Sequence, residues 1–223
     1  MKKIFLIATT VLAFAANAFA APAKPFTSGI MLTEGLEIAR GDGAPDFDDF
    51  NGFRYFTNLS YNALIGITPE LFIHPSIGFV IRTASEAETE TTSNGVSFSS
   101  STTAKQSNIA MGLGIPVTAR YYITNVFFAE LGLEFDINFF ESYYSKEADE
   151  WNKVDDAKTL NFGINAGFGF TFAFGLEIGL AYTHGITDLY EQHTFGVGPL
   201  SIKSNTWSYS RINFNVGYWF GYR

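Results

Sequence analysis

Apolar and polar residues alternate with a period of two along most of this chain. Between residues 53 and 67, the odd positions hold Phe, Tyr, Leu, Ile, Ala and one Thr, whereas the even positions include Arg54, Asn58 and Asn62. Residues 109–123, 127–139 and 160–172 repeat the pattern, with Gly, Asn, Thr and charged residues opposite the apolar face. A period of two is typical of β-strands because successive side chains point to opposite sides. The pattern therefore predicts an all-β protein whose strands each have one apolar face.

The alternation and the connections between its segments predict eight strands. They cover residues 29–40, 53–67, 71–84, 107–123, 127–140, 159–172, 176–187 and 207–222. Three connections of three residues (68–70, 124–126, 173–175) alternate with four long ones (41–52, 85–106, 141–158, 188–206). Short turns that alternate with long loops are typical of up-and-down antiparallel barrels that span bacterial outer membranes. We therefore expect an eight-stranded transmembrane β-barrel with its termini on the periplasmic side.

A soluble barrel with its apolar faces turned inward is the alternative. Two features favour the membrane. The apolar faces run for six to eight positions without a polar break, whereas strands of soluble proteins have about 5–6 residues in total. The opposite faces combine Gly and Asn with Arg and Glu, which suits a crowded lumen of paired polar groups. A transmembrane strand needs about 9–11 residues with apolar side chains facing the lipid.

The N-terminus has the features of a secretory signal peptide. Lys2 and Lys3 precede an apolar run at residues 4–16, and Ala18-Phe19-Ala20 forms a small-residue cleavage site. The alternative, a membrane anchor helix, needs about 18–20 apolar residues, which this run lacks. The expected division is therefore a signal peptide at 1–20 and a barrel domain at 21–223, in an exported protein.

Hairpin parity provides an independent check. Three-residue turns keep the outward faces of Ile67 and Leu71 in register, and Gly175 occupies the last turn position, where a left-handed residue is common. Asn94-Gly95 does not fit simply, because a two-residue turn there pairs odd positions with even ones. We expect either a bulge or a longer turn in that hairpin.

Charges on the predicted inward faces are nearly balanced. The lumen is expected to contain Arg54, Arg82, Arg120 and Arg211 together with Glu130, Glu134, Asp136 and Glu177, with Glu37 as a further candidate. An eight-stranded barrel has an interior that side chains fill, and a buried charge is costly unless it is paired. These residues therefore predict an Arg–carboxylate network that plugs the lumen. The alternative is a gated path for small solutes.

The net charge of -8 becomes about -10 when Lys2 and Lys3 leave with the signal peptide. The four long loops hold 15 acidic and 5 basic residues, whereas the rest of the mature chain holds 7 of each. This excludes nucleic acid as a partner, because a polyanion requires cationic side chains. Divalent cations or basic partners near the lipopolysaccharide surface suit the loops better.

The sequence gives little support for a metal-binding site or for a site that uses a thiol. The absence of Cys excludes disulfides, thiolate metal sites and Cys nucleophiles. Asp42, Asp46, Asp48 and Asp49 crowd the first long loop, but their spacing is not that of a Ca²⁺ loop, and a solvated acidic loop is the favoured interpretation. We predict no metal and no cofactor.

The last strand carries a further motif. Asn215, Gly217, Phe220 and Tyr222 follow the pattern polar-x-Gly-x-x-hydrophobic-x-hydrophobic, which resembles the signal read by the barrel assembly machinery, although Arg223 replaces the usual final aromatic. Residues 182–189 resemble a penultimate-strand motif. On these residues the chain resembles the small outer-membrane β-barrel family of the OmpA/OmpX porin-like type. The resemblance implies a monomeric eight-stranded barrel with no assigned chemistry.

Enzymatic activity is not expected. His74-Pro75-Ser76 has the His-x-Ser spacing of lipid A deacylases, but both residues are predicted to face inward near the periplasmic end. His184 is predicted to face outward, yet position 186 is Ile, and His193 lies in a loop. Acyl transfer needs a nucleophile beside a base, and this requirement is not met.

The sequence thus predicts a barrel of the bacterial outer membrane, in contact with lipid and lipopolysaccharide. Its expected role is structural or one of surface interaction through the four outer loops, and the sequence identifies no extracellular ligand. A small-solute porin is the alternative, and an enzyme that modifies lipid A is less favoured.

Overall fold

The computed structural model describes residues 25–41, 53–84, 87–90, 103–145, 149–154, 157–189, 194–195, 202–203 and 208–222. The predicted signal peptide at residues 1–20 lies outside these residues, as do His193, Arg223 and the acidic residues Asp42, Asp46, Asp48 and Asp49. Within them, no helix is long and apolar enough to cross a membrane.

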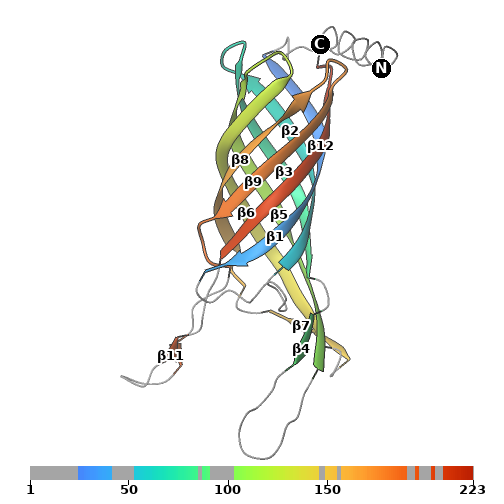
Figure 1. Cartoon of the computed structure of the whole chain (residues 1–223), viewed down its shortest axis with the longest axis vertical. Coiled ribbons are helices and arrows are strands. Elements are labelled where there is room, and N and C mark those ends of the chain that lie inside the picture. Colours follow the sequence, from blue (N-terminus) through green and yellow to red (C-terminus); the bar gives the residue numbers. More distant parts are fainter. Residues whose placement is uncertain are drawn as a thin grey trace, which may run out of the picture.

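Eight antiparallel strands close into a barrel (Figure 1). They are β1 (Phe26–Arg40), β2 (Phe53–Gly66), β3 (Leu71–Ala84), β5 (Thr103–Tyr122), β6 (Phe127–Ser145), β8 (Leu160–Thr171), β9 (Leu176–Gly185) and β12 (Ser208–Phe220). Each strand pairs with the next, and pairing of β1 with β12 closes the ring. The predicted fold class is therefore confirmed.

The two ends of the barrel differ. Three tight turns lie at one end, together with the start of β1 and the end of β12, and we call this the turn end (Figure 1). The opposite loop end carries four short strands, β4 (Ala87–Glu90), β7 (Glu150–Lys153), β10 (Thr194–Phe195) and β11 (Ile202–Lys203). Short β4 and β7 flank extensions of β5 and β6 beyond the barrel.

The tight turns have the predicted three residues. The Phe172 amide donates to the Leu176 carbonyl at 2.7 Å, and the Ile67 and Ile123 amides make the equivalent bonds. Gly175 has a φ of 97°, in the left-handed region that glycine adopts without a Cβ penalty. A three-residue turn that ends in a left-handed residue matches the right-handed twist of the two strands.

One register shift lies where the Asn94-Gly95 hairpin raised a conflict. Strand β3 pairs Thr83 with Ile109, whereas β4 pairs Ala87 with Gln106. From the first pair to the second, the chain advances by four residues from Thr83 to Ala87 but by only three along β5, from Ile109 to Gln106. One extra residue therefore lies between β3 and β4, and odd positions of β4 pair with even positions of β5. This is the irregularity that a bulge produces. Asn94 and Gly95 themselves lie outside the described residues.

A second bulge changes the predicted parity of β6. Met111 pairs with Phe140, but Gly112 pairs with Asn138, so Phe139 is an extra residue. Beyond it the strand continues to Ser145, and Glu141 turns inward with 6% of its surface exposed. The prediction that the strand ends at residue 140 and that Glu141 belongs to an outer loop is wrong. A bulge reverses the two faces of a strand, which periodicity within one strand does not reveal.

The barrel is apolar outside and polar inside. Leu59 and Leu131 on the outer wall are 61% and 60% exposed, whereas Arg120 and Arg211 inside are 1% exposed. A soluble barrel has the reverse distribution, so this observation rejects the soluble alternative.

Candidate functional site

The barrel interior is arranged in layers along its axis. From the loop end they are a group of seven charged side chains, a small cavity, a group of four titratable side chains, and an apolar cap at the turn end. We call the two groups the outer and inner charge clusters. The outer one comprises Glu37, Arg54, Arg82, Glu134, Asp136, Glu141 and Arg211, and the inner one comprises His74, Arg120, Glu130 and Glu177.

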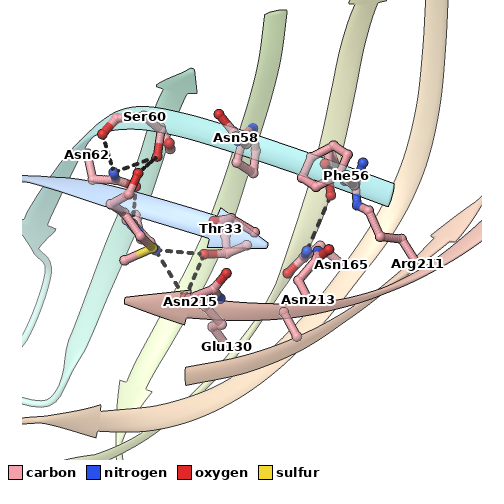
Figure 2. Close-up of a pocket in the computed structure, with 17 residues that line it drawn as sticks. Thr33, Phe56, Asn58, Ser60, Asn62, Glu130, Asn165, Arg211, Asn213 and Asn215 are labelled. Atoms are coloured by element: carbon pink, nitrogen blue, oxygen red, sulfur yellow. Dashed lines mark hydrogen bonds and ion pairs between the residues drawn. The ribbon is translucent and has the colours of Figure 1, made fainter. Parts of the chain in front are cut away.

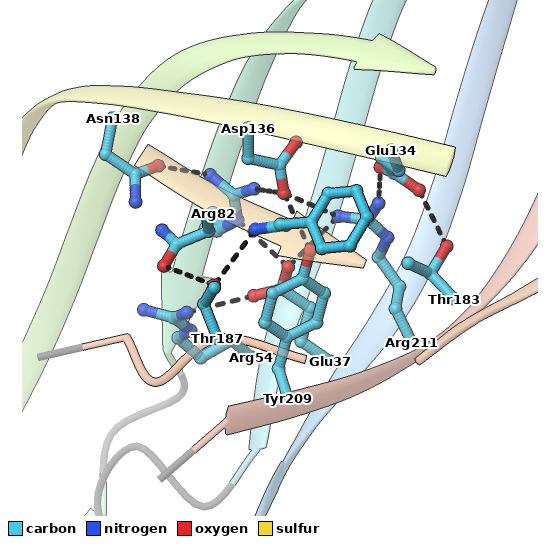
Figure 3. A network of polar contacts seen from close by, with 12 residues as sticks. Glu37, Arg54, Arg82, Glu134, Asp136, Asn138, Thr183, Thr187, Tyr209 and Arg211 are labelled. Atoms are coloured by element: carbon cyan, nitrogen blue, oxygen red, sulfur yellow. Dashed lines mark hydrogen bonds and ion pairs between the residues drawn. The ribbon is translucent and has the colours of Figure 1, made fainter. Parts of the chain in front are cut away.

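Glu37 lies at the centre of the outer cluster (Figure 3). One of its oxygens accepts from Arg82 Nε at 2.9 Å and from Arg211 Nη1 at 3.1 Å, and the other lies 3.0 Å from Arg54 Nη2. The three arginines come from β3, β12 and β2, so one carboxylate from β1 links four strands. This convergence follows from the inward parity of each strand, which places all four residues in the same lumen.

The other three carboxylates of the outer cluster complete the arginine contacts. Arg82 Nη2 donates to Asp136 at 2.7 Å, Arg211 donates to Glu134, and Arg54 Nη1 lies 3.3 Å from Glu141. In addition, the Tyr209 hydroxyl donates to Asp136 at 3.0 Å. Figure 3 shows the contacts of Asp136 and Glu134 with Arg82, Arg211 and Tyr209. Removing one partner of such a buried pair typically costs about 3–5 kcal/mol, because a charge is left uncompensated.

Arg120 organises the inner cluster. Its Nη1 and Nη2 atoms donate to the two oxygens of Glu177 at 2.6 and 2.9 Å, and Nη2 also donates to Glu130 at 2.9 Å. The guanidinium stacks on the Phe128 ring, 3.8 Å from its centroid. A two-pronged contact of this kind holds a guanidinium rigidly.

Neighbouring groups hold the two carboxylates of the inner cluster. His74 Nδ1 lies 3.0 Å from Glu130, and its Nε2 lies 3.1 Å from Asn62 Oδ1. Glu177 also accepts from the Trp219 indole at 2.6 Å and from the Thr171 hydroxyl at 3.0 Å. The inner cluster is therefore tied to β2, β3, β5, β6, β8, β9 and β12.

An apolar cap fills the turn end of the lumen, next to the inner cluster. It consists of Met31, Leu64, Phe72, Tyr122, Phe128, Trp219 and Tyr222. Alternation along the predicted last strand, residues 207–222, places Tyr222 on the same outward face as Phe220, and this prediction is wrong. The strand ends at Phe220, Gly221 adopts a φ of 58°, and Tyr222 folds inward with 2% exposure. Its hydroxyl donates to that of Tyr122 at 3.2 Å.

Between the two clusters lies a cavity of about 50 Å³ (Figure 2). Its lining is polar and includes Asn58, Asn165, Asn213 and Thr33. The Oδ1 atoms of Asn58 and Asn213 are buried without a hydrogen-bond partner among the described residues. At roughly 12 Å³ per water the cavity accommodates about four water molecules, which suit such atoms. It is too small for a sugar or an amino acid.

All eight residues predicted for the lumen network lie in the two clusters, and Glu37 joins them. Sequence reasoning missed Glu141, because the bulge at Phe139 is invisible in the pattern. It also considered His74 only as a candidate catalytic base. The inward assignment of Glu130 was the signal that could have indicated a carboxylate partner for the inward His74.

The histidines do not form a hydrolytic site among the described residues. His74 and Ser76 face the interior, as predicted, and the ring nitrogens of His74 contact Glu130 and Asn62. His184 lies on the outer wall beside Tyr182. No group of three or more Asp, Glu or His residues within the described ranges is arranged to hold a metal ion.

Comparison with known proteins gives one family and a set of distant folds. The family model described as outer membrane protein beta-barrel domain matches residues 27–191. No curated protein matches the chain. The chain is similar to Ail, the attachment invasion locus protein of Yersinia pestis, with 12% identity, a TM-score of 0.43, and coverage of 88% of this chain and 100% of that one.

Two other solved structures are similar at the same level. The outer membrane protein OprG from Pseudomonas aeruginosa has 14% identity and a TM-score of 0.46, with 87% of this chain and 94% of that one covered. The outer membrane protease OmpT from Escherichia coli has 10% identity and a TM-score of 0.38, with 89% and 97% covered.

Proposed function

The chain belongs to the outer membrane protein beta-barrel domain family, and from this premise we propose that it is a non-enzymatic barrel with a plugged lumen and interacting outer loops. It is a protein of the bacterial outer membrane. The charge clusters that cross its lumen are the single observation that carries the proposal. The loop end faces the cell exterior, since long loops of such barrels are extracellular.

The plug follows from the energetics of the interior. An open path requires separation of both charge clusters and displacement of the aromatic cap. Each buried pair that loses a partner costs about 3–5 kcal/mol, so an open state that breaks several pairs is very rarely populated. The cavity of about 50 Å³ lies between the clusters, with Glu134 and Arg211 of the outer cluster and His74 and Glu130 of the inner cluster in its lining. The porin alternative is therefore not favoured.

The proposed surface role rests on the loop end. Strands β4, β5, β6 and β7 pair in that order beyond the barrel, which gives an antiparallel extension (Figure 1). Its aromatic side chains include Tyr144 and Trp151, whose rings lie 5.4 Å apart, and Trp151 is 57% exposed. The Tyr144 hydroxyl donates to Asp149, and this bond raises the pKa of Tyr144. With Glu141 assigned to the lumen, the loops retain 14 acidic and 5 basic residues.

Two measurements test these proposals. We expect the purified protein to give no steady conductance in planar bilayers, and reproducible single-channel openings would contradict the plug. For the surface role, excision of residues 85–106 should abolish cell-surface binding while heat-modifiable gel mobility shows that the barrel still folds. Binding that survives the excision would place the interaction elsewhere.

We also propose that the barrel acts as a monomer and is assembled by the machinery that reads its last strand. Asn215, Gly217 and Phe220 lie within β12, and Phe220 is exposed on the outer wall. Tyr222 packs in the cap, so it contributes to the folded barrel as well as to any signal. Substitution of Phe220 by Ser should slow insertion in cells more than it lowers the stability of the folded barrel.

A further inference from the structure

The outer wall of the barrel has a hollow on the β8–β9–β12 side. Its volume is about 380 Å³, and its lining includes Ala166, Phe168, Leu180, Tyr182 and Ile212. The register places Ala166 beside Tyr182 of β9, which in turn lies beside Ile212 of β12. Ala166 is the smallest outward side chain of its strand, so its methyl group leaves a gap between larger neighbours. We call this hollow the wall notch.

Polar groups lie on the loop-end side of the wall notch. The Tyr182 hydroxyl donates to Ser210 Oγ at 3.0 Å and lies 3.3 Å from His184 Nδ1. Ser210 and His184 are register partners on β12 and β9. The Tyr182 hydroxyl uses its hydrogen on Ser210, so its oxygen accepts from His184 Nδ1. The three side chains thus form a chain of hydrogen bonds that leaves the Ser210 hydroxyl hydrogen available to an external acceptor. Polar groups on a lipid-facing wall are costly unless they have a partner.

The two features together have the shape of an acylated lipid. The notch is lined mainly by apolar side chains, with Glu130 also in its lining. The donors lie toward the loop end, which faces the outer leaflet because the long loops of such barrels are extracellular. The notch continues the lipid-facing surface of a protein located in the outer membrane, so lipid is the molecule that surrounds it. A second copy of this chain is a poor fit, because two convex barrel walls touch along a line and do not fill a recess between side chains.

We propose that the wall notch binds one acyl chain of an outer-leaflet phosphoglycolipid of the lipopolysaccharide type. The chain lies along Ala166, Leu180 and Ile212, and the carbonyl at its linkage accepts a hydrogen bond from Ser210. Apolar burial contributes little, since the tail leaves one apolar environment for another. Close packing in the notch and the hydrogen bond at its rim supply the preference.

Native mass spectrometry of the full-length barrel in detergent, titrated with purified lipid A, tests the proposal. The wild-type protein should retain one lipid A molecule. Substitution Ala166→Phe fills the notch and should weaken retention at least tenfold, and Tyr182→Phe should weaken it by about fivefold through loss of the hydrogen-bond chain. Ala119→Phe is the matched control, because Ala119 is also an outward alanine but lies on β5. It should leave retention unchanged.

Each alternative outcome has a clear meaning. Equal retention by the Ala166→Phe and Ala119→Phe proteins overturns the site. Equal retention of lipid A and a phosphatidylethanolamine by the wild type overturns the assignment to a glycolipid. A dimer that Ala166→Phe dissolves would show that a second copy occupies the notch, which also refutes the proposal. Heat-modifiable gel mobility verifies that each variant folds. If the Phe side chain prevents folding, Ala166→Leu is used in place of Ala166→Phe.

Discussion

Replacement of Arg120 by Met removes the guanidinium of the inner charge cluster and leaves an unbranched apolar side chain in its place. Glu130 retains His74 at 3.0 Å, but Glu177 retains only two neutral donors, the Trp219 indole and the Thr171 hydroxyl. A carboxylate that is 1% exposed is thus left without a cation. Loss of one partner from a buried pair costs about 3–5 kcal/mol, and we expect a loss of about 4 kcal/mol in unfolding free energy for Arg120→Met.

A double-mutant cycle isolates this contribution. The second substitution, Glu177→Gln, removes the orphaned charge, so Arg120→Met/Glu177→Gln should be less destabilised than the sum of the single variants by about 2 kcal/mol. Glu70→Gln is the control, because Glu70 lies exposed in a turn, and it should change stability by less than about 0.5 kcal/mol.

The assay is reversible urea unfolding in phospholipid vesicles, followed by tryptophan fluorescence. Trp219 donates to Glu177, and replacing Trp151 and Trp207 by Phe in every variant leaves its emission as the report on the cluster. A cost below about 1 kcal/mol for Arg120→Met, or strictly additive single variants, would refute the view that paired charges hold the lumen closed. Conductance recorded on the same variants shows whether the outer cluster and the cap close the barrel without Arg120.

Three further substitutions test individual features. Glu141→Gln should cost about 1–3 kcal/mol in the same unfolding assay, whereas Glu150→Gln on the exposed edge of β7 should be nearly neutral; equal effects would contradict the bulge that turns Glu141 inward. Tyr222→Ala should lower stability by about 3–5 kcal/mol as buried aromatics do, and Phe220→Ala should cost much less, so the reverse order would place Tyr222 outside the cap. Gly175→Ala should cost at least about 1 kcal/mol and slow refolding measured by gel mobility, and an unaffected variant would show that the turn does not need a left-handed residue.

The alternation of apolar and polar residues was sufficient to predict the barrel and its inward charges. A strand has a strict period of two, and a slip of one residue exposes its whole polar face to lipid. For this reason the inward assignment of Arg120, Glu130 and Arg211 follows from parity alone. The three-residue turns and the left-handed Gly175 also follow from local chemistry, because a tight turn is decided by residues adjacent in the chain.

The partners of those charges depend on closure of the barrel. Glu37 meets Arg211, which is 174 residues away, because β1 pairs with β12. It meets Arg82, which is 45 residues away, across the intervening strand β2. The inward turn of Glu141 comes from a mismatch between two strands, and the wall notch at Ala166 comes from side chains of three strands. Periodicity describes one strand at a time, so the sequence determined the face of a residue only within a regular strand. The tertiary structure decided where a bulge or a strand end reversed that face, as at Glu141 and Tyr222, and which residues meet in the lumen.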